Sequence, residues 1–190
     1  MELLTPTRDL LATPEELLRA RLDAVPPGIS GWKQLEDAGT NALRHLLVPP
    51  LADPIIQARS YSGIDRRDAI FPNRNHDVPN HWGRLLHELE ARMVLVEFKN
   101  YDTREVGKDE VNQTRNYLTK PMGRLALMVS ATEPNHAARI KRNTVYSEDG
   151  KVIVFLTVEH LKEMLYMKER GEEPSDLIMD TIERFYIEWE

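Results

Sequence analysis

The chain has 190 residues, with 25 Lys and Arg against 31 Asp and Glu, and a formal net charge of −6. This length suits one domain with a substantial core, and the negative charge argues against a protein that coats nucleic acid through bulk charge. The sequence contains no Cys, which excludes disulfides, thiolate metal sites and a Cys nucleophile. Nothing resembles a signal peptide or a spanning helix, so we expect a cytoplasmic protein without membrane contact.

Two predicted helices come first along the chain. Thr13-Pro14-Glu15-Glu16 is a typical helix start, with Thr as the cap, Pro in the first turn and acids near the positive end of the helix dipole. This helix ends at Pro26-Pro27-Gly28. A second amphipathic helix is expected over residues 32–48, where apolar side chains follow helical spacing, and Pro49-Pro50 ends it.

Two strands are expected next. Residues 55–61 form the first and residues 66–71 the second, with Gly63 permitting a turn between them. A polar loop follows over residues 72–80. Residues 82–91 then have the pattern of a helix.

One acidic residue in the second strand is a candidate for chemistry. Side-chain alternation predicts that Arg66 and Asp68 share one face of this strand and that Arg67 points away. Asp65 is a rival acid, but it lies at the turn, before the apolar part of the strand. On alternation alone, Asp68 is the preferred candidate.

The rest of the chain alternates strands with helices. The expected elements are a central strand at 93–99, a helix at 108–120, a strand at 125–131, a helix at 135–145, a strand at 151–156, and helices at 157–170 and 175–189. This order predicts a mixed β-sheet flanked by helices.

The central strand is an apolar run that ends in two charged residues. Residues two apart on a strand point to the same face, so Glu97 and Lys99 are expected side by side, while Val94, Val96 and Phe98 point the other way into packing. Unpaired buried charge is expensive. With Asp68 on a neighbouring strand, two carboxylates and one ammonium would converge, which suits a divalent cation and a phosphate.

The two C-terminal helices are rich in apolar residues. We expect them to expose more apolar surface than one end of a small sheet requires, and therefore to form a homodimer or to dock a partner protein. The residues concerned are Leu161, Met164, Leu165, Met167, Leu177, Ile178, Ile182, Phe185, Tyr186 and Trp189.

Taken together, these motifs resemble the PD-(D/E)XK nuclease superfamily, whose fold is restriction-endonuclease-like. Asp68 matches the first acid, Glu97 the second and Lys99 the lysine; Gln113 and Tyr117 match a Gln-x-x-x-Tyr pattern on the following helix. The sequence has Arg where the family name has Pro. The resemblance implies a single nuclease domain over 1–190, with a core at about 31–156, an N-terminal helical extension at 1–28 and an extra C-terminal helical hairpin at 157–190.

The resemblance also implies a site for Mg²⁺, with Mn²⁺ as an alternative. Asp68 and Glu97 would hold the ion, with the Phe98 carbonyl as a third ligand. Lys99 would orient or polarise the attacking water, and Gln113 would assist. Several families of this superfamily offer a Glu from the helix before the first strand; Glu36 is the candidate here, and its alternative is an ordinary surface Glu.

Four residues are candidates for nucleic-acid binding: Arg66, Arg74, Arg115 and Tyr117. Arg74 lies in the loop expected at the active-site edge, and Tyr117 has an almost equally good interpretation as partly buried core. Phosphate contacts require basic residues on one surface rather than a high isoelectric point.

The leading hypothesis is a Mg²⁺-dependent endonuclease that cleaves DNA, in restriction or antiviral defence, with RNA left open as a substrate. One alternative is a non-catalytic nucleic-acid-binding or assembly subunit on the same scaffold. Another is a protein-interaction module whose working surface is the acidic C-terminal pair of helices.

Overall fold

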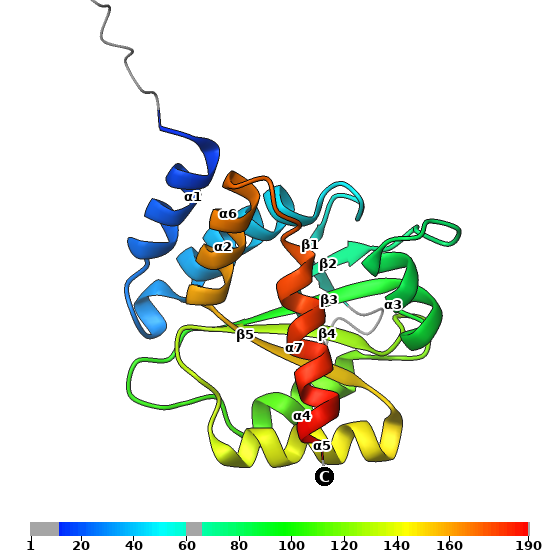
Figure 1. Ribbon diagram of the computed structural model, residues 1–190. Helices are drawn as coiled ribbons and strands as arrows, with labels where there is room; N and C mark the ends of the chain where they lie inside the picture. Colours follow the sequence, from blue (N-terminus) through cyan, green and yellow to red (C-terminus); the bar gives the residue numbers. More distant parts are fainter. Residues whose placement is uncertain (1–11, 60–65, 190) are drawn as a thin grey trace, which may run out of the picture.

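The computed structural model describes residues 12–59 and 66–189 and contains a five-stranded sheet in the order β1-β2-β3-β4-β5 (Figure 1). β1, β2 and β3 pair antiparallel, whereas β3, β4 and β5 pair parallel. The predicted mixed sheet is therefore confirmed. Its strands are β1 (Ile55–Arg59), β2 (Arg66–Pro72), β3 (Met93–Lys99), β4 (Leu125–Ser130) and β5 (Val152–Thr157).

Helices cover both faces of this sheet. The buried clusters place α2, α3, α6 and α7 against one face, and α4 with α5 against the other (Figure 1). The helices are α1 (Pro14–Asp23), the short 3₁₀ helix η1 (Ile29–Gly31), α2 (Trp32–Leu47), α3 (His81–Leu89), α4 (Lys108–Tyr117), α5 (His136–Asp149), α6 (Val158–Glu169) and α7 (Ser175–Glu188). Among the described residues, none of these helices is long and apolar enough to cross a membrane.

Local signals explain most of the element boundaries. The Thr13 side chain accepts the backbone N–H of Glu16, and the Glu16 side chain accepts that of Thr13, so the predicted cap of α1 is confirmed. Thr157 caps α6, as predicted, because its hydroxyl oxygen accepts the backbone N–H of His160. The predicted turn at Gly63 and the rival acid Asp65 lie outside the described residues.

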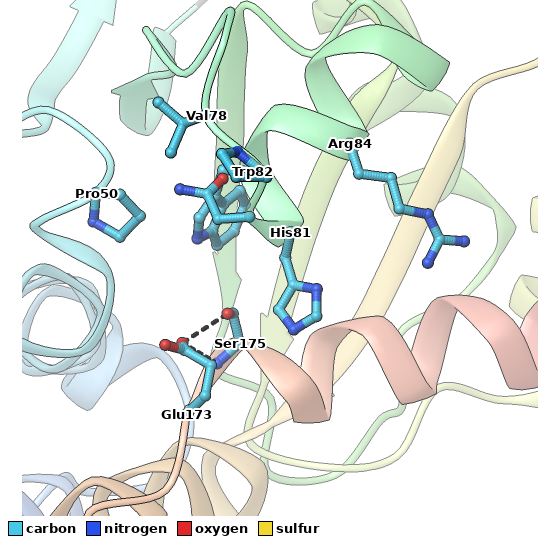
Figure 2. Close-up of a pocket in the computed structure, with 9 residues that line it drawn as sticks. Pro50, Val78, His81, Trp82, Arg84, Glu173 and Ser175 are labelled. Carbon is cyan, nitrogen blue, oxygen red and sulfur yellow. Dashed lines mark hydrogen bonds between the residues drawn. The ribbon is translucent and has the colours of Figure 1, made fainter.

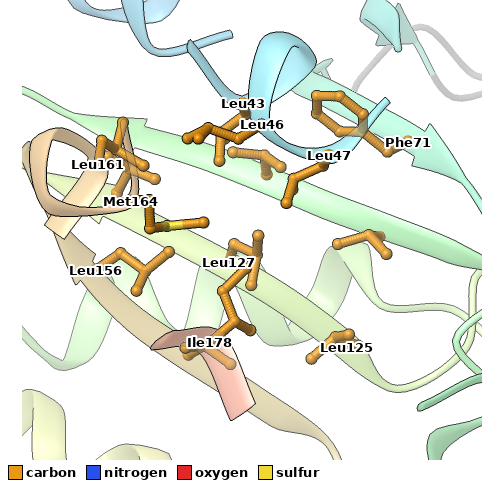
Figure 3. Close-up of a cluster of buried hydrophobic side chains, with 14 of the residues drawn as sticks. Leu43, Leu46, Leu47, Phe71, Leu125, Leu127, Leu156, Leu161, Met164 and Ile178 are labelled. Carbon is orange, nitrogen blue, oxygen red and sulfur yellow. The ribbon is translucent and has the colours of Figure 1, made fainter. Parts of the chain in front are cut away.

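The main core lies between the sheet and the helices of the α2 face (Figure 3). Leu43 and Leu47 of α2 are buried there with Phe71 of β2 and Leu127 of β4. The same cluster contains Val94, Val96 and Phe98, whereas Leu95 belongs to the cluster on the α4 face. The alternation predicted for β3 is therefore confirmed, and it turns Glu97 and Lys99 toward α4.

The apolar residues of the C-terminal helices are mostly inside the protein. Met164 of α6 and Ile178 and Phe185 of α7 are buried in the main core. The expectation of a large surplus of exposed apolar surface was wrong, because these helices cover the sheet themselves. The exposed exceptions on α7 and just after it are Ile187 and Trp189. A homodimer through these helices stays a prediction without that support.

Candidate active site

Two acids meet where β2 and β3 separate. The paired positions of these strands run from Pro72 opposite Met93 to Ala69 opposite Val96. At the next position the Asp68 carboxylate, through Oδ2, accepts the backbone N–H of Phe98 at 2.9 Å. The carboxylate thus takes the place of a strand partner. This bond holds the Asp68 side chain beside β3, next to the Glu97 side chain, which is 3% exposed.

Side-chain alternation in β2 breaks at this point. Arg66 reaches Glu36 and lies over Trp32, both on α2, whereas Arg67 lies near the Tyr117 ring on α4. Arg66 and Asp68 nevertheless line the same cavity, so the structure does not separate them to opposite sides of the sheet. In the neighbouring β1, Gln57 has a φ of 52°, and no paired position is found between Ile56 with Ala69 and Ala58 with Arg67.

Lys99 is linked to both β3 and α4. Its Nζ donates to Gln113 Oε1 at 3.1 Å and lies 3.4 Å from Glu97 Oε2. Gln113 Nε2 in turn donates to the Tyr117 hydroxyl at 2.9 Å. This chain of contacts limits the positions that the ammonium can take, so Gln113 and Tyr117 support the lysine rather than stand apart from it.

These residues line one cavity of about 490 Å³. The structure therefore brings together Asp68 of β2, Glu97 and Lys99 of β3, and Gln113 of α4. The Phe98 backbone, Arg66 and Tyr117 line the same cavity. Further lining residues that the motif did not indicate include Ile29, Trp32, Tyr101 and Arg104.

Both acids have raised pKa values in the protein without metal. Burial, and then the neighbouring Asp68 charge, raise the pKa of Glu97 to about 7. Burial also raises the pKa of Asp68, against the stabilising Phe98 N–H. Among the described residues, Glu97 Oε1 is buried without a hydrogen-bond partner. Such an atom is costly to bury unless something else binds it.

The metal-binding groups of this cavity suit Mg²⁺, which keeps waters and substrate oxygens in its coordination shell, better than a metal whose ligands all come from the protein. In residues 12–59 and 66–189, no group of three or more His, Cys, Asp or Glu is placed to hold a metal ion. Mg²⁺ commonly takes one or two carboxylates and completes its shell with waters and substrate phosphate. Asp68, the unsatisfied Glu97 Oε1 and the open cavity provide this arrangement, so these residues fit the expected ion.

Glu36 is buried but is not brought into the pair of acids. Its side chain is 2% exposed, so it is no ordinary surface Glu. Its Oε1 accepts from Gln57 Nε2 at 2.9 Å and from Lys33 at 3.3 Å, while its Oε2 lies 3.4 Å from Arg66. Its charge nevertheless helps to raise the pKa of Asp68. Glu36 therefore orders the residues around the site, and the structure does not show it as a third ligand.

Two of the expected nucleic-acid contacts are placed elsewhere. Arg74 follows the far end of β2, where Pro72 pairs with Met93, so the expectation that this loop leaves at the active-site edge was wrong. Arg115 bonds to Asp149 at 2.6 Å and to Glu148 at 2.9 Å on α5. Neither arginine lines the cavity of the two acids.

Arg104 is a cavity residue that the motif did not indicate. Its guanidinium lies 3.7 Å from the centre of the Tyr101 ring, and its Nη1 lies 2.9 Å from Glu110. Glu110 is itself held by the Tyr101 hydroxyl and the Gly107 N–H, both at 2.9 Å. Its position in the sequence could have indicated that it lines the cavity, because Arg104 lies in the loop that directly follows the central strand.

A second cavity, of about 570 Å³, lies at the start of α3 (Figure 2). Pro50, Trp82 and Glu173 line it, but no predicted site residue does. The Glu173 carboxylate accepts from the Ser175 hydroxyl at 2.6 Å, and thereby fixes the start of α7. The side chains of this second cavity connect helices and include no predicted catalytic residue. We therefore assign the catalytic candidates to the cavity that contains Asp68.

The mixed sheet, flanked by helices and carrying its acids where β2 and β3 separate, defines a restriction-endonuclease-like fold. The chain is similar to the restriction endonuclease FokI bound to DNA, with a TM-score of 0.54 and 12% sequence identity. The match covers 90% of this chain and 34% of FokI. At this identity the similarity shows the fold.

In sequence, the chain is similar to an Escherichia coli (strain K12) protein named "Putative transposon gamma-delta 80.3 kDa protein". The two are 27% identical over 165 residues, and the match covers 85% of this chain and 23% of that protein. This chain thus corresponds to about a quarter of the relative. No protein-family model matches the sequence.

Proposed function

We propose that the chain is a Mg²⁺-dependent nuclease, with Mn²⁺ as an alternative metal, that hydrolyses phosphodiester bonds in DNA. The observation that supports this most is the meeting of Asp68, Glu97 and Lys99 at one open cavity, with Glu97 Oε1 unsatisfied among the described residues. FokI, whose structure contains DNA, supports DNA as the substrate class.

Each residue has a separate task in this proposal. Asp68, Glu97 and the Phe98 carbonyl hold the ion, and Mg²⁺ bound there would polarise a phosphoryl oxygen and help to ionise a water molecule. Lys99 directs its ammonium at the attacking water or at the phosphate, where negative charge develops. Gln113 keeps that ammonium in place through its 3.1 Å bond.

Arg104 and Arg66 are the proposed phosphate contacts. Both line the cavity, and both guanidinium groups are partly exposed. Arg104 is held by Tyr101 and Glu110, so less conformational freedom is lost when it binds a phosphate. Guanidinium groups bind phosphate oxygens through two parallel hydrogen bonds. A role in restriction or antiviral defence stays part of the proposal.

The test is a cleavage assay on supercoiled plasmid, linear duplex and single-stranded DNA, with Mg²⁺, with Mn²⁺ and with EDTA. We expect metal-dependent cleavage that is lost in Asp68→Ala, Glu97→Ala and Lys99→Ala. Glu159→Ala and Lys120→Ala change exposed residues outside the cavity and serve as matched controls. Cleavage that survives in all three site variants would refute the proposal, and DNA binding without any cleavage would favour the non-catalytic alternative.

A further inference from the structure

An exposed aromatic ring lies at the rim of the proposed active site. Trp32 is 44% exposed and Ile29 is 89% exposed, and both line the cavity that contains Asp68 and Glu97. Trp32 is the first residue of α2. Its exposure shows that it contributes little to the core, so its position beside the acids needs another explanation.

The rim that carries these side chains is held firmly. Asn100 Nδ2 donates to the carbonyl oxygens of Pro26 and Gly28, at 2.9 Å each. Gly28 has a φ of 81°, and a Cβ on Gly31 would lie 1.8 Å from the Pro26 carbonyl oxygen. Asn100 directly follows Lys99 in the sequence. The rim is therefore fixed to the strand that carries the proposed catalytic lysine.

A positive charge accompanies the ring. The Arg66 guanidinium carbon lies 5.4 Å from the centre of the Trp32 ring, and Arg66 is paired with Glu36. Arg104 and Lys99 line the same cavity. Aromatic faces with nearby cations are the usual means of binding unpaired nucleotides, because the ring stacks on the base while the cations attract the phosphates.

We propose that Trp32, together with Ile29, is a stacking platform for an unpaired base next to the phosphate at Asp68 and Glu97. The bases of a duplex are already stacked on their neighbours, so only a single strand or a locally unpaired region could use this platform. The inference rests on the proposed nuclease function and narrows its substrate class to DNA that is unpaired at the cleavage point.

Tryptophan fluorescence tests this directly, because the chain has three tryptophans in different surroundings. Trp82 is 1% exposed in the core, and Trp189 follows α7 outside the cavity. The probe is a short oligothymidine single strand, in Ca²⁺, which shares the oxygen ligands of Mg²⁺ but has looser geometry. We expect quenching that persists in Trp189→Phe and is lost in Trp32→Phe.

Affinity provides the second measurement. Anisotropy of a labelled oligothymidine should show a loss of roughly 5- to 150-fold in Trp32→Ala and a smaller loss in Trp32→Phe. A duplex of the same length with G·C ends should bind Trp32→Ala and the unchanged protein alike. An unchanged denaturation midpoint in Trp32→Ala would exclude a folding defect as the cause.

The outcomes separate this inference from the nuclease proposal. Equal losses for single strand and duplex, or no loss at all, would overturn the platform even if the protein cleaves DNA. Quenching at Trp32 in a protein that never cleaves would support the platform and count against the nuclease. A protein that binds neither probe would overturn both.

Discussion

The carboxylate of Asp68 accepts the backbone N–H of Phe98 at 2.9 Å, although thirty residues separate them in the chain. This bond occupies the first position at which β2 and β3 no longer pair as strands. One acid therefore completes the hydrogen bonding of the neighbouring strand and is held next to Glu97 by the same contact. Asp68 thus has a structural task, as the acceptor of the Phe98 N–H, and a proposed catalytic task, as a metal ligand.

Two substitutions of Asp68 should separate these tasks. Asp68→Asn keeps an oxygen that can accept the Phe98 N–H but loses the charge, so we expect cleavage to be lost with stability nearly unchanged. Asp68→Ala also leaves the N–H without its partner, at a further cost on the order of 1 kcal/mol. Plasmid cleavage and urea denaturation measure the two effects. Full activity in Asp68→Asn would contradict the role of Asp68 as a metal ligand.

Glu97 should make the metal-free protein less stable at higher pH. Its folded pKa is raised to about 7 from an ordinary 4.5. The folded state therefore holds the proton more tightly, and the stabilisation is fully present below pH 4.5 and is lost as the pH rises through 7. Glu97→Gln lacks this dependence, so at pH 8 it should be more stable than the unchanged protein by about 1–3 kcal/mol.

The measurement is the free energy of unfolding of both proteins between pH 4.5 and 8, in EDTA and in Mg²⁺. Their difference isolates Glu97 from the other titrating groups. Mg²⁺ should stabilise the unchanged protein at pH 8 and have much less effect on Glu97→Gln, which should not cleave DNA. A difference that stays constant with pH would show that Glu97 does not titrate in this range.

Arg104 should contribute more to DNA binding than the arginines outside the cavity. We expect Arg104→Ala to weaken binding by roughly tenfold and to reduce the salt dependence by about one phosphate contact. Arg74→Ala is the matched control, because Arg74 is also an exposed arginine but lies at the far end of β2. Binding titrations at several salt concentrations measure both. Equal effects of the two substitutions would mean that the cavity arginine has no special role.

Glu36→Gln should distinguish an ordering role from a metal-binding one. Gln keeps an oxygen that can accept from Gln57, while the charge that helps to raise the pKa of Asp68 disappears. We expect Mg²⁺ affinity to change less than about tenfold, the lower limit for loss of an outer-shell metal partner, and cleavage to persist. Calorimetric titration with Mg²⁺ provides the comparison with Asp68→Asn. A complete loss of metal binding would instead identify Glu36 as a ligand.

Much of the architecture could be predicted from local patterns. The apolar runs, the caps at Thr13 and Thr157 and the breaks at proline and glycine are short-range signals, and the structure confirms the mixed sheet that they predict. The strict alternation in β3 was enough to predict that Glu97 and Lys99 share a face. It was less informative in β2, where Arg67 lies near the Tyr117 ring on α4 although Ala69, two residues later, is buried on the α2 face.

The sequence by itself determined the order of elements and the set of two acids and a lysine, because periodicity and residue chemistry are encoded within a few neighbours. Only the tertiary structure decided which arginines face the cavity, that Glu36 is buried, and that the C-terminal apolar residues cover the sheet. Arg115 shows why: its partners Asp149 and Glu148 come from another helix, some thirty residues later. The local sequence pattern allows a side chain such as Arg115 several possible partners, and the packing of distant segments decides which of these contacts forms.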